Sequence, residues 1–130
     1  MAASGPFHPK PSSRSYGTVV ISTAAAAVSD VINLTGLTLS SIQTSTDWTA
    51  ADIGFKGNVD GSTNYYPLFG STGDRLTFVA TASQMLVFDP SRFAGVQVLQ
   101  LTSQATDGTP VAQGVARTIK LGLSEFVEAD

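Results

Sequence analysis

Short segments in which apolar and polar residues alternate recur along this chain, and residues typical of turns separate them. About eight or nine such segments follow one another at intervals of about 8–12 residues. No stretch has the apolar repeat of about 3.6 residues that marks an amphipathic helix. The pattern predicts an all-β protein, specifically an antiparallel β-sandwich. A jelly roll is the expected topology, and an immunoglobulin-like sandwich is the alternative that strand spacing leaves open.

The individual strands follow from local composition. Residues 18–23 are almost all β-branched, which favours a strand, and the alanines at 24–27 are interpreted as a loop. Further strands are expected at residues 31–34, 37–42, 52–59, 65–69, 76–80, 85–88, 95–102 and 115–123. The strands at 76–80 and 85–88 are expected to form a pair. In the last strand, Ile119, Leu121 and Leu123 are expected on one face and Lys120 on the other.

Two local features are more specific. Ile53, Phe55 and Val59 fall on alternate positions and are expected on one face of their strand. The Asp-Gly-Ser-Thr turn at 60–63 is expected to join this strand to the next one as a hairpin. The Asp-Pro sequence at 89–90 predicts a single helical turn, because Asp caps a helix start and Pro suits its first position.

The first 15 residues differ from the rest because Pro and Ser dominate them. Prolines at this density favour an extended backbone and cannot donate hydrogen bonds to a sheet. We therefore expect an extended arm at 1–15, a sandwich domain at 16–123 and a short tail at 124–130. Phe7 and Tyr16 are the expected anchors of the arm, since aromatic side chains bury a large area with few rotatable bonds.

Composition excludes several function classes. Charged residues make up 13% of the chain against a usual ~25%, and the net charge of -3 argues against nucleic-acid binding. The longest apolar run, at 24–28, is far shorter than the ~20 residues of a membrane span. The absence of cysteine excludes disulfides and thiolate metal sites, and His8 is the single histidine.

The acidic residues point to structure and not to chemistry. A paired-carboxylate glycosidase site needs set separations across a cleft, but most carboxylates here fall at turns, where Asp bonds its own backbone. Residues 58–64 space oxygen ligands as calcium loops do, yet no bidentate Glu follows, so a hairpin turn is the favoured interpretation. We expect no enzyme activity, small-molecule substrate, cofactor or metal.

Carbohydrate binding is a competing function. Sugar-binding sandwiches stack an exposed aromatic ring on the sugar, and Trp48, Tyr65 and Tyr66 are the candidates for such a platform. The structural interpretation of Trp48 is a plug at one end of the sandwich. Adjacent strand residues point to opposite faces, so at most one of the two tyrosines lies in the core.

The low charge favours assembly. A sandwich has edge strands, which monomers normally protect with Lys, Pro or other charges. The lysines here are few, and one of them, Lys10, lies in the arm. Protein interfaces are depleted in charge in the same way. The expected partners are other copies of the chain, in a small symmetric oligomer and specifically a trimer.

The order of several turn and core segments resembles a group of small virion proteins of tailed bacteriophages. The likeness covers about residues 18–123 and rests on the segments at 48–51, 53–63, 66–69, 88–90, 93–95, 110–113 and 117–119. The resemblance implies a compact β-sandwich that decorates the head or serves as an accessory part of the particle. The turn at 60–63 also recurs in discoidin-like sugar-binding sandwiches, which keeps carbohydrate binding open.

The function expected from this resemblance is decoration or cementing of the capsid surface. The protein would be made in the bacterial cytoplasm and located on the virion, with the major capsid protein as its partner. The contact residues expected in and beside the arm are Phe7, Pro9, Pro11, Arg14 and Tyr16. A neck, collar or tail-attached protein is the first alternative, and a glycan- or receptor-binding module is the second.

Overall fold

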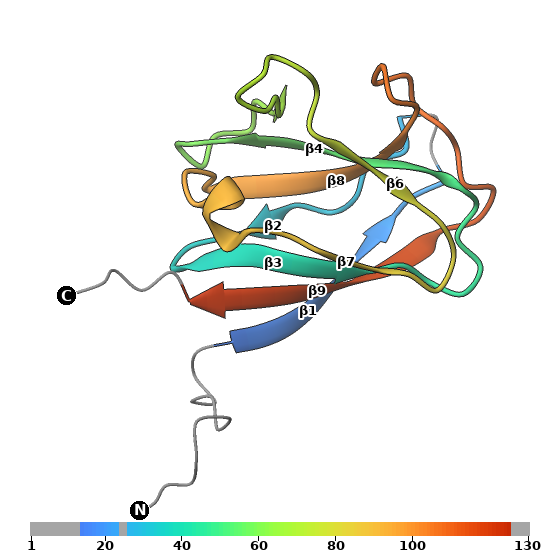
Figure 1. Ribbon diagram of the computed structural model, residues 1–130, viewed down its shortest axis with the longest axis horizontal. Helices are drawn as coiled ribbons and strands as arrows, with labels where there is room; N and C mark the ends of the chain where they lie inside the picture. Colours follow the sequence, from blue (N-terminus) through green and yellow to red (C-terminus); the bar gives the residue numbers. More distant parts are fainter. Residues whose placement is uncertain (1–13, 24–25, 126–130) are drawn as a thin grey trace, which may run out of the picture.

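Two antiparallel β-sheets pack face to face in this protein (Figure 1). The computed structural model describes residues 14–23 and 26–125. One sheet, here the β1 sheet, has the order β1-β9-β3-β7. Its strands are β1 (Arg14–Ile21), β3 (Leu37–Gln43), β7 (Met85–Val87) and β9 (Arg117–Glu125). Because every described pairing is antiparallel, the predicted antiparallel sandwich is confirmed.

The other sheet, here the β4 sheet, has the order β2-β8-β4-β5, and β6 also pairs with β4. Its strands are β2 (Ile32–Asn33), β4 (Ala51–Asn58), β5 (Tyr66–Pro67), β6 (Thr77–Ala80) and β8 (Val98–Gln104). The long strands β4 and β8 lie in register from Asp52 beside Gln104 to Asn58 beside Val98. This pair forms the centre of the sheet, and the shorter strands flank it.

Most connections pass from one sheet to the other. Only the link from β4 to β5 and the link from β5 to β6 stay within the same sheet. This separates the predicted pair of strands at 76–80 and 85–88. β6 joins β4 in one sheet and β7 joins β3 in the other, so the expected pairing between them is wrong. Crossing connections of this kind are typical of Greek-key sandwiches. They are compatible with a jelly roll, which stays an interpretation.

Alternation of side chains along the strands produces the core between the sheets. In β9, Ile119 and Leu121 are buried and Lys120 is exposed, so they lie on opposite faces as predicted. In β4, Ile53 and Phe55 are buried, also as predicted. The prediction for Val59 is wrong, because β4 ends at Asn58 and Val59 is exposed in the turn that follows.

Aromatic rings fill one part of the core. Phe55, Phe78, Phe88 and Phe93 form a cluster in which neighbouring ring centroids lie 4.8 to 6.0 Å apart. Most of these pairs meet edge to face, an arrangement that aromatic quadrupoles favour. The 3-10 helix η2 (Pro90–Phe93) carries the ring of Phe93 into this cluster.

The start of η2 follows the sequence prediction. The side chain of Asp89 accepts a hydrogen bond from the backbone N–H of Ser91, and Pro90 occupies the first position of the helix. The Ser91 hydroxyl donates to the same carboxylate at 2.9 Å. These two hydrogen bonds with Ser91 hold the pKa of Asp89 below its usual value of 3.8.

A buried polar network occupies another part of the molecule, where β9 begins. Arg117 donates to the side-chain and backbone oxygens of Gln113 and to the Thr49 hydroxyl, and it pairs with Asp47 at 2.9 Å. Gln113 in turn donates to the Thr49 carbonyl and the Ser103 hydroxyl, and accepts from the Thr49 N–H. The guanidinium and the amide are thus buried with several partners each.

Candidate interaction surfaces

The predicted contact residues divide between described and undescribed parts of the chain. Phe7, Pro9 and Pro11 lie outside the described residues. Arg14 begins β1, and Tyr16 lies two residues further along the same strand. The sheet therefore begins two residues before the predicted start of the domain, and β9 continues past residue 123 to Glu125.

Tyr16 lies on the outer face of the β1 sheet. Its side chain is 70% exposed, whereas Val19 and Ile21 on the alternate positions of β1 are buried. The strand register places Tyr16 beside Gly122, Gly122 beside Ser41, and Ser41 beside Val87. One row of residues thus crosses all four strands, with large apolar side chains at both ends and small residues between.

A second row runs parallel to the first. Thr18 lies beside Lys120, Lys120 beside Gln43, and Gln43 beside Met85. Among the residues of the two rows, Lys120 alone carries a charge. Apart from Lys120, these two rows therefore expose hydroxyl, amide and apolar groups, which lose less solvation free energy than charged groups when a partner covers them.

Small residues leave a shallow hollow on this face. It has a volume of about 140 Å³ and lies between Tyr16 and Met85. Gly122 lies beneath it, and a Cβ atom at this position would collide with the Ser41 hydroxyl. The missing side chain thus lets β9 and β3 approach closely and keeps the middle of the face low.

Trp48 is not available as a sugar platform. Its side chain is only 4% exposed and belongs to the hydrophobic core. Stacking on a sugar requires a ring with one face open to solvent. The position agrees with the interpretation of Trp48 as a plug.

The two tyrosines of the predicted platform differ in exposure. Tyr66 is 64% exposed and Tyr65 is half-buried. Tyr66 borders a hollow of about 380 Å³, which is also lined by Asn58, Asp60 and Asn64. Of the three aromatic residues expected in a sugar site, Tyr66 is the one the structure places beside polar groups and a concave surface.

The polar groups of this hollow serve the hairpin turn. Asn58 donates to the carbonyl oxygens of Ser62 and Asn64, and its own side-chain oxygen accepts from the Gly61 N–H. Asp60 accepts from the N–H of Ser62, and this backbone bond lowers the pKa of the carboxyl. Gly61 adopts a φ of +74°, which favours glycine. The loop interpreted as a turn and not as a calcium site satisfies its own polar groups.

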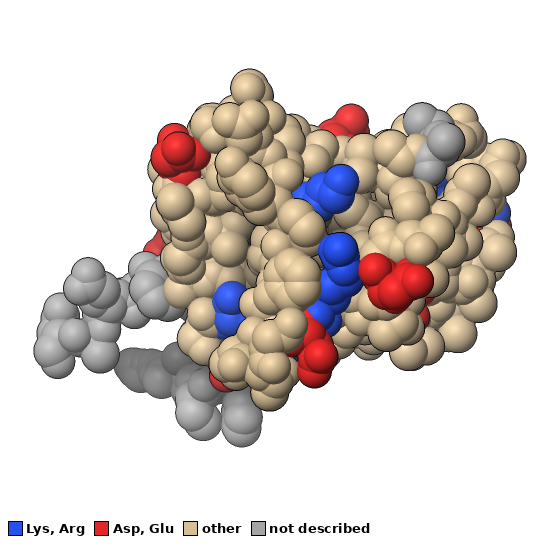
Figure 2. Space-filling view, turned by 90° about the horizontal axis from the view of Figure 1, so that it is seen from above, with Lys and Arg blue, Asp and Glu red and all other residues tan. Residues whose placement is uncertain are grey.

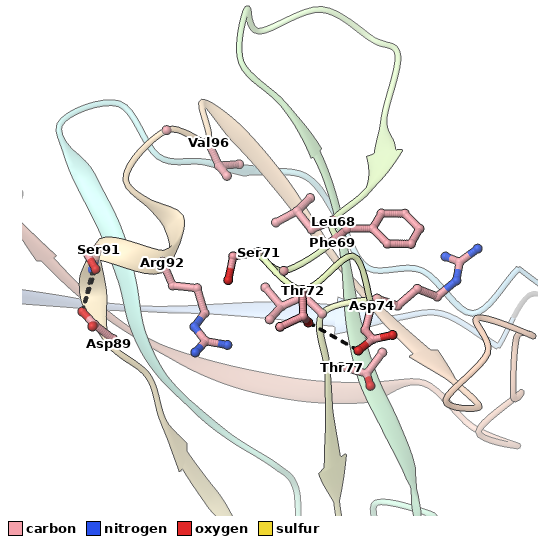
Figure 3. A pocket seen from close by; sticks show the side chains of 14 residues that line it. Leu68, Phe69, Ser71, Thr72, Asp74, Thr77, Asp89, Ser91, Arg92 and Val96 are labelled. Carbon is pink, nitrogen blue, oxygen red and sulfur yellow. Dashed lines mark hydrogen bonds between the residues drawn. The ribbon is translucent and has the colours of Figure 1, made fainter.

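A further hollow lies between η2 and the loop that joins β5 to β6 (Figure 3). It has a volume of about 740 Å³ and contains two arginines and two aspartates. Arg75 lies over the ring of Phe69, and Arg92 lies over the ring of Phe78. Asp89 caps η2, and Asp74 accepts from the Thr72 hydroxyl.

Two hydroxyls in this hollow bond to neighbouring carboxylates, because Ser91 donates to Asp89 and Thr72 donates to Asp74. The charges of the hollow balance, and the arginines stack on rings while Asp89 holds the helix start. Within residues 14–23 and 26–125, no group of three or more acidic or histidine side chains is positioned to hold a metal ion.

Charged side chains are sparse on the face seen in Figure 2. Lys and Arg lie near its middle, carboxylates lie beside them and at the margins, and uncharged residues cover most of the area. The described part of the chain contains no helix of the length and apolarity needed to cross a bilayer.

Several exposed apolar residues were not predicted from the sequence. Val20, Val79, Met85 and Val87 are all exposed. Their signal was present in the alternation, because each lies next to a residue that points inward. Which of the two faces meets the core depends on the opposing sheet, which the sequence alone does not show.

Comparison of the chain with protein-family models, with curated proteins and with solved structures finds no match. The sandwich and its surfaces are thus the observations from which a function is inferred.

Proposed function

We propose that this chain is a non-enzymatic structural protein of a bacteriophage particle that decorates the capsid surface as a small oligomer. The observation that carries the proposal is the outer face of the β1 sheet, which is bordered by exposed Tyr16 and Val87 and whose two rows of residues contain a single charge, Lys120. The order of turn and core segments that resembles small virion proteins supports the same function. The proposed location is the virion surface.

The chemistry of this face suits protein contact. Interface cores are depleted in charged residues and enriched in aromatic residues and Met, which describes the rows of Tyr16 and Met85. A capsid presents the same site many times. Weak contacts made by several linked copies therefore add to a high avidity.

Binding to empty heads tests this function. Met85→Glu and Val87→Lys place charges on the outer face of the β1 sheet, where both side chains are exposed, so the fold is expected to persist. We expect both variants to lose occupancy on the heads, because a desolvated, unpaired charge is costly. Val79→Lys is the matched control, since Val79 is equally exposed but lies in the β4 sheet.

The contribution of the arm is tested separately. Deletion of residues 1–13 removes Phe7, Pro9 and Pro11 while leaving β1 complete. The proposal that the arm contacts the coat predicts reduced occupancy. Undiminished occupancy would show that the arm does not contribute to capsid binding, and it would not contradict the proposed role of the β1 sheet. Labelling the bound protein in electron micrographs distinguishes the head from the neck, collar or tail.

Glycan binding is the second candidate, favoured by the exposed ring of Tyr66 beside Asn64 and the hollow of about 380 Å³. This function predicts a signal on a glycan array that Tyr66→Ala abolishes. Tyr16→Ala, which removes an exposed tyrosine from the opposite sheet, is the matched control. An array without signal for the full chain would eliminate this candidate.

A further inference from the structure

Within residues 14–23 and 26–125, β1 is paired along one side and open along most of the other. Its register with β9 continues without a shift from Arg14 beside Ser124 to Ile21 beside Arg117. On its other side, the described contacts are confined to the end of the strand. Ser29 forms an isolated bridge with Ile21, and the Asp30 N–H donates to the Val20 carbonyl oxygen.

The open side lacks the protection usual for edge strands. Natural edges are short, interrupted by a bulge, or guarded by Lys or Pro. β1 is eight residues long, has no register shift, contains neither Lys nor Pro, and carries its one charged residue, Arg14, at its first position. By contrast, the edge strand β7 at the far side of the same sheet has only three residues.

The bond from Asp30 to Val20 identifies the backbone groups that face outward. The N–H and C=O groups of one strand residue point to the same side, and those of the next residue point to the other. The Val20 carbonyl points away from β9. The backbone groups of Arg14, Tyr16 and Thr18 therefore point the same way, toward the open side.

We propose that β1 of a second copy pairs antiparallel with this edge, with Tyr16 of each copy opposite Tyr16 of the other on a two-fold axis. The register follows from two constraints. The segment ending at Asp30 already occupies the edge beside Val20, so pairing extends no further than Thr18. Of the registers that place outward-facing residues opposite one another, Arg14 opposite Thr18 pairs the largest number of β1 residues, and it centres the pair on Tyr16. Such a pair forms about six backbone hydrogen bonds.

Charge complementarity selects a second copy as the partner. Arg14 is the charged residue of β1, and Asp30 is exposed beside the end of the open edge. In the proposed register, Arg14 of one copy lies opposite Thr18, one outward-facing position from Asp30 of the other copy. The two-fold axis brings these two residue positions near one another twice. Cross-strand aromatic pairs also stabilise antiparallel sheets.

The inference deepens the proposed function by naming the contact between copies, and it replaces the expected trimer with a dimer. Its test uses the purified full chain and no phage particle. A chain that is monomeric but occupies heads would contradict the dimer alone. A dimer that fails to occupy heads would contradict the decoration function alone.

Sedimentation and light scattering measure the oligomeric state. We expect the full chain to form dimers, and Tyr16→Lys to weaken dimerisation more than about tenfold, because two like charges meet at the axis. Val87→Lys, on the same face at the opposite edge, is expected to leave the dimer intact. Monomers at every concentration, a closed trimer, or equal effects of both variants would overturn the proposal.

Cross-linking tests the register. The chain has no cysteine, so Tyr16→Cys introduces a single thiol, and opposite Cα atoms in such a pair lie about 5.5 Å apart. A short thiol-to-thiol reagent is expected to join the Tyr16→Cys chains and to leave Val87→Cys chains single. Equal cross-linking of both variants would overturn the register. Circular dichroism establishes that each variant keeps its sheet content.

Discussion

Two parts of the sandwich interior are stabilised by different means. Beside η2, four phenylalanine rings pack against one another, and Phe93 is fully buried. Where β9 begins, a guanidinium and an amide are buried instead, and their partners are Thr49, Ser103 and Asp47. The first region depends on filled volume, and the second depends on each polar group having a partner.

The difference shows how each region tolerates change. Rings without polar atoms lose free energy mainly when a cavity forms. Polar groups buried in a network lose free energy when one removed partner leaves others unpaired. The following variants separate these two effects, with the largest expected loss of stability first.

Phe93→Ala opens a cavity in the aromatic cluster. Because Phe93 contacts the rings of both Phe55 and Phe88, we expect the free energy of unfolding to fall by about 3–5 kcal/mol. Chemical denaturation followed by fluorescence or circular dichroism measures the change. Phe93→Leu, which retains much of the volume, is the control and is expected to cost less than Phe93→Ala. A loss below about 1 kcal/mol for Phe93→Ala would contradict the importance of the cluster.

Gln113→Leu keeps a similar volume but removes the amide from the polar network. The Thr49 N–H and carbonyl and the Nε of Arg117 then lose their partner, so we expect a loss of about 1–3 kcal/mol. The same denaturation experiment measures it. Gln84→Leu, at a half-buried glutamine outside this network, is the control. Equal losses for the two variants would show that the network adds nothing beyond ordinary side-chain contacts.

Arg117→Met is expected to cost less than Gln113→Leu, about 1 kcal/mol. Methionine replaces the buried part of the arginine side chain, and the carboxylate it leaves behind, Asp47, is exposed to water. The amide of Gln113 also keeps its bonds to Thr49. Denaturation of both variants in one buffer shows which loses more stability. A larger loss for Arg117→Met than for Gln113→Leu would show that the network stabilises the protein mainly through the charge of Arg117.

The smallest expected effect is a dependence on pH. The nearby Ser45 hydroxyl and the positive charge of Arg117 lower the pKa of Asp47 below its usual value of 3.8. A carboxyl with a lowered pKa in the folded state stabilises the protein above the unfolded value, and this contribution disappears as the pH falls through the folded pKa. Stability should therefore decline below about pH 3.8.

Asp47→Asn is expected to remove a small part of that decline. The rest persists, because hydrogen bonds also lower the pKa of Asp60, Asp89 and Asp107. Urea midpoints measured at neutral pH and below the usual carboxyl pKa give the comparison. An unchanged decline in the variant would exclude a role for Asp47.

Several features were predictable because neighbouring residues determine them. The alternation of Ile119, Lys120 and Leu121 gave the orientation of β9, and the Asp-Pro pair gave the start of η2. The hairpin after Asn58 also agrees with its turn sequence. Each depends on backbone preferences or hydrogen bonds that span only a few residues.

Other features could not be predicted from local sequence. The burial of Trp48 distinguishes a plug from a sugar platform, and it depends on the opposing sheet. The local sequence did not predict that Arg117 is buried. Two of its partners, Asp47 and Thr49, lie far from it in the sequence, and Gln113 lies in the loop before β9. The burial of Arg117 is tolerable only because the fold gathers these oxygen atoms.

The amino-acid sequence by itself determined that this protein is built of strands, where many of them turn, and that few charges cover it. Only the tertiary structure decided that β6 and β7 belong to different sheets, that Tyr16 and Val87 border one face, and that few of the described residues pair with the second side of β1. Side-chain alternation and turn conformation are properties of adjacent residues. Sheet pairing and edge exposure depend on contacts between distant segments, which exist only once the two sheets have packed together.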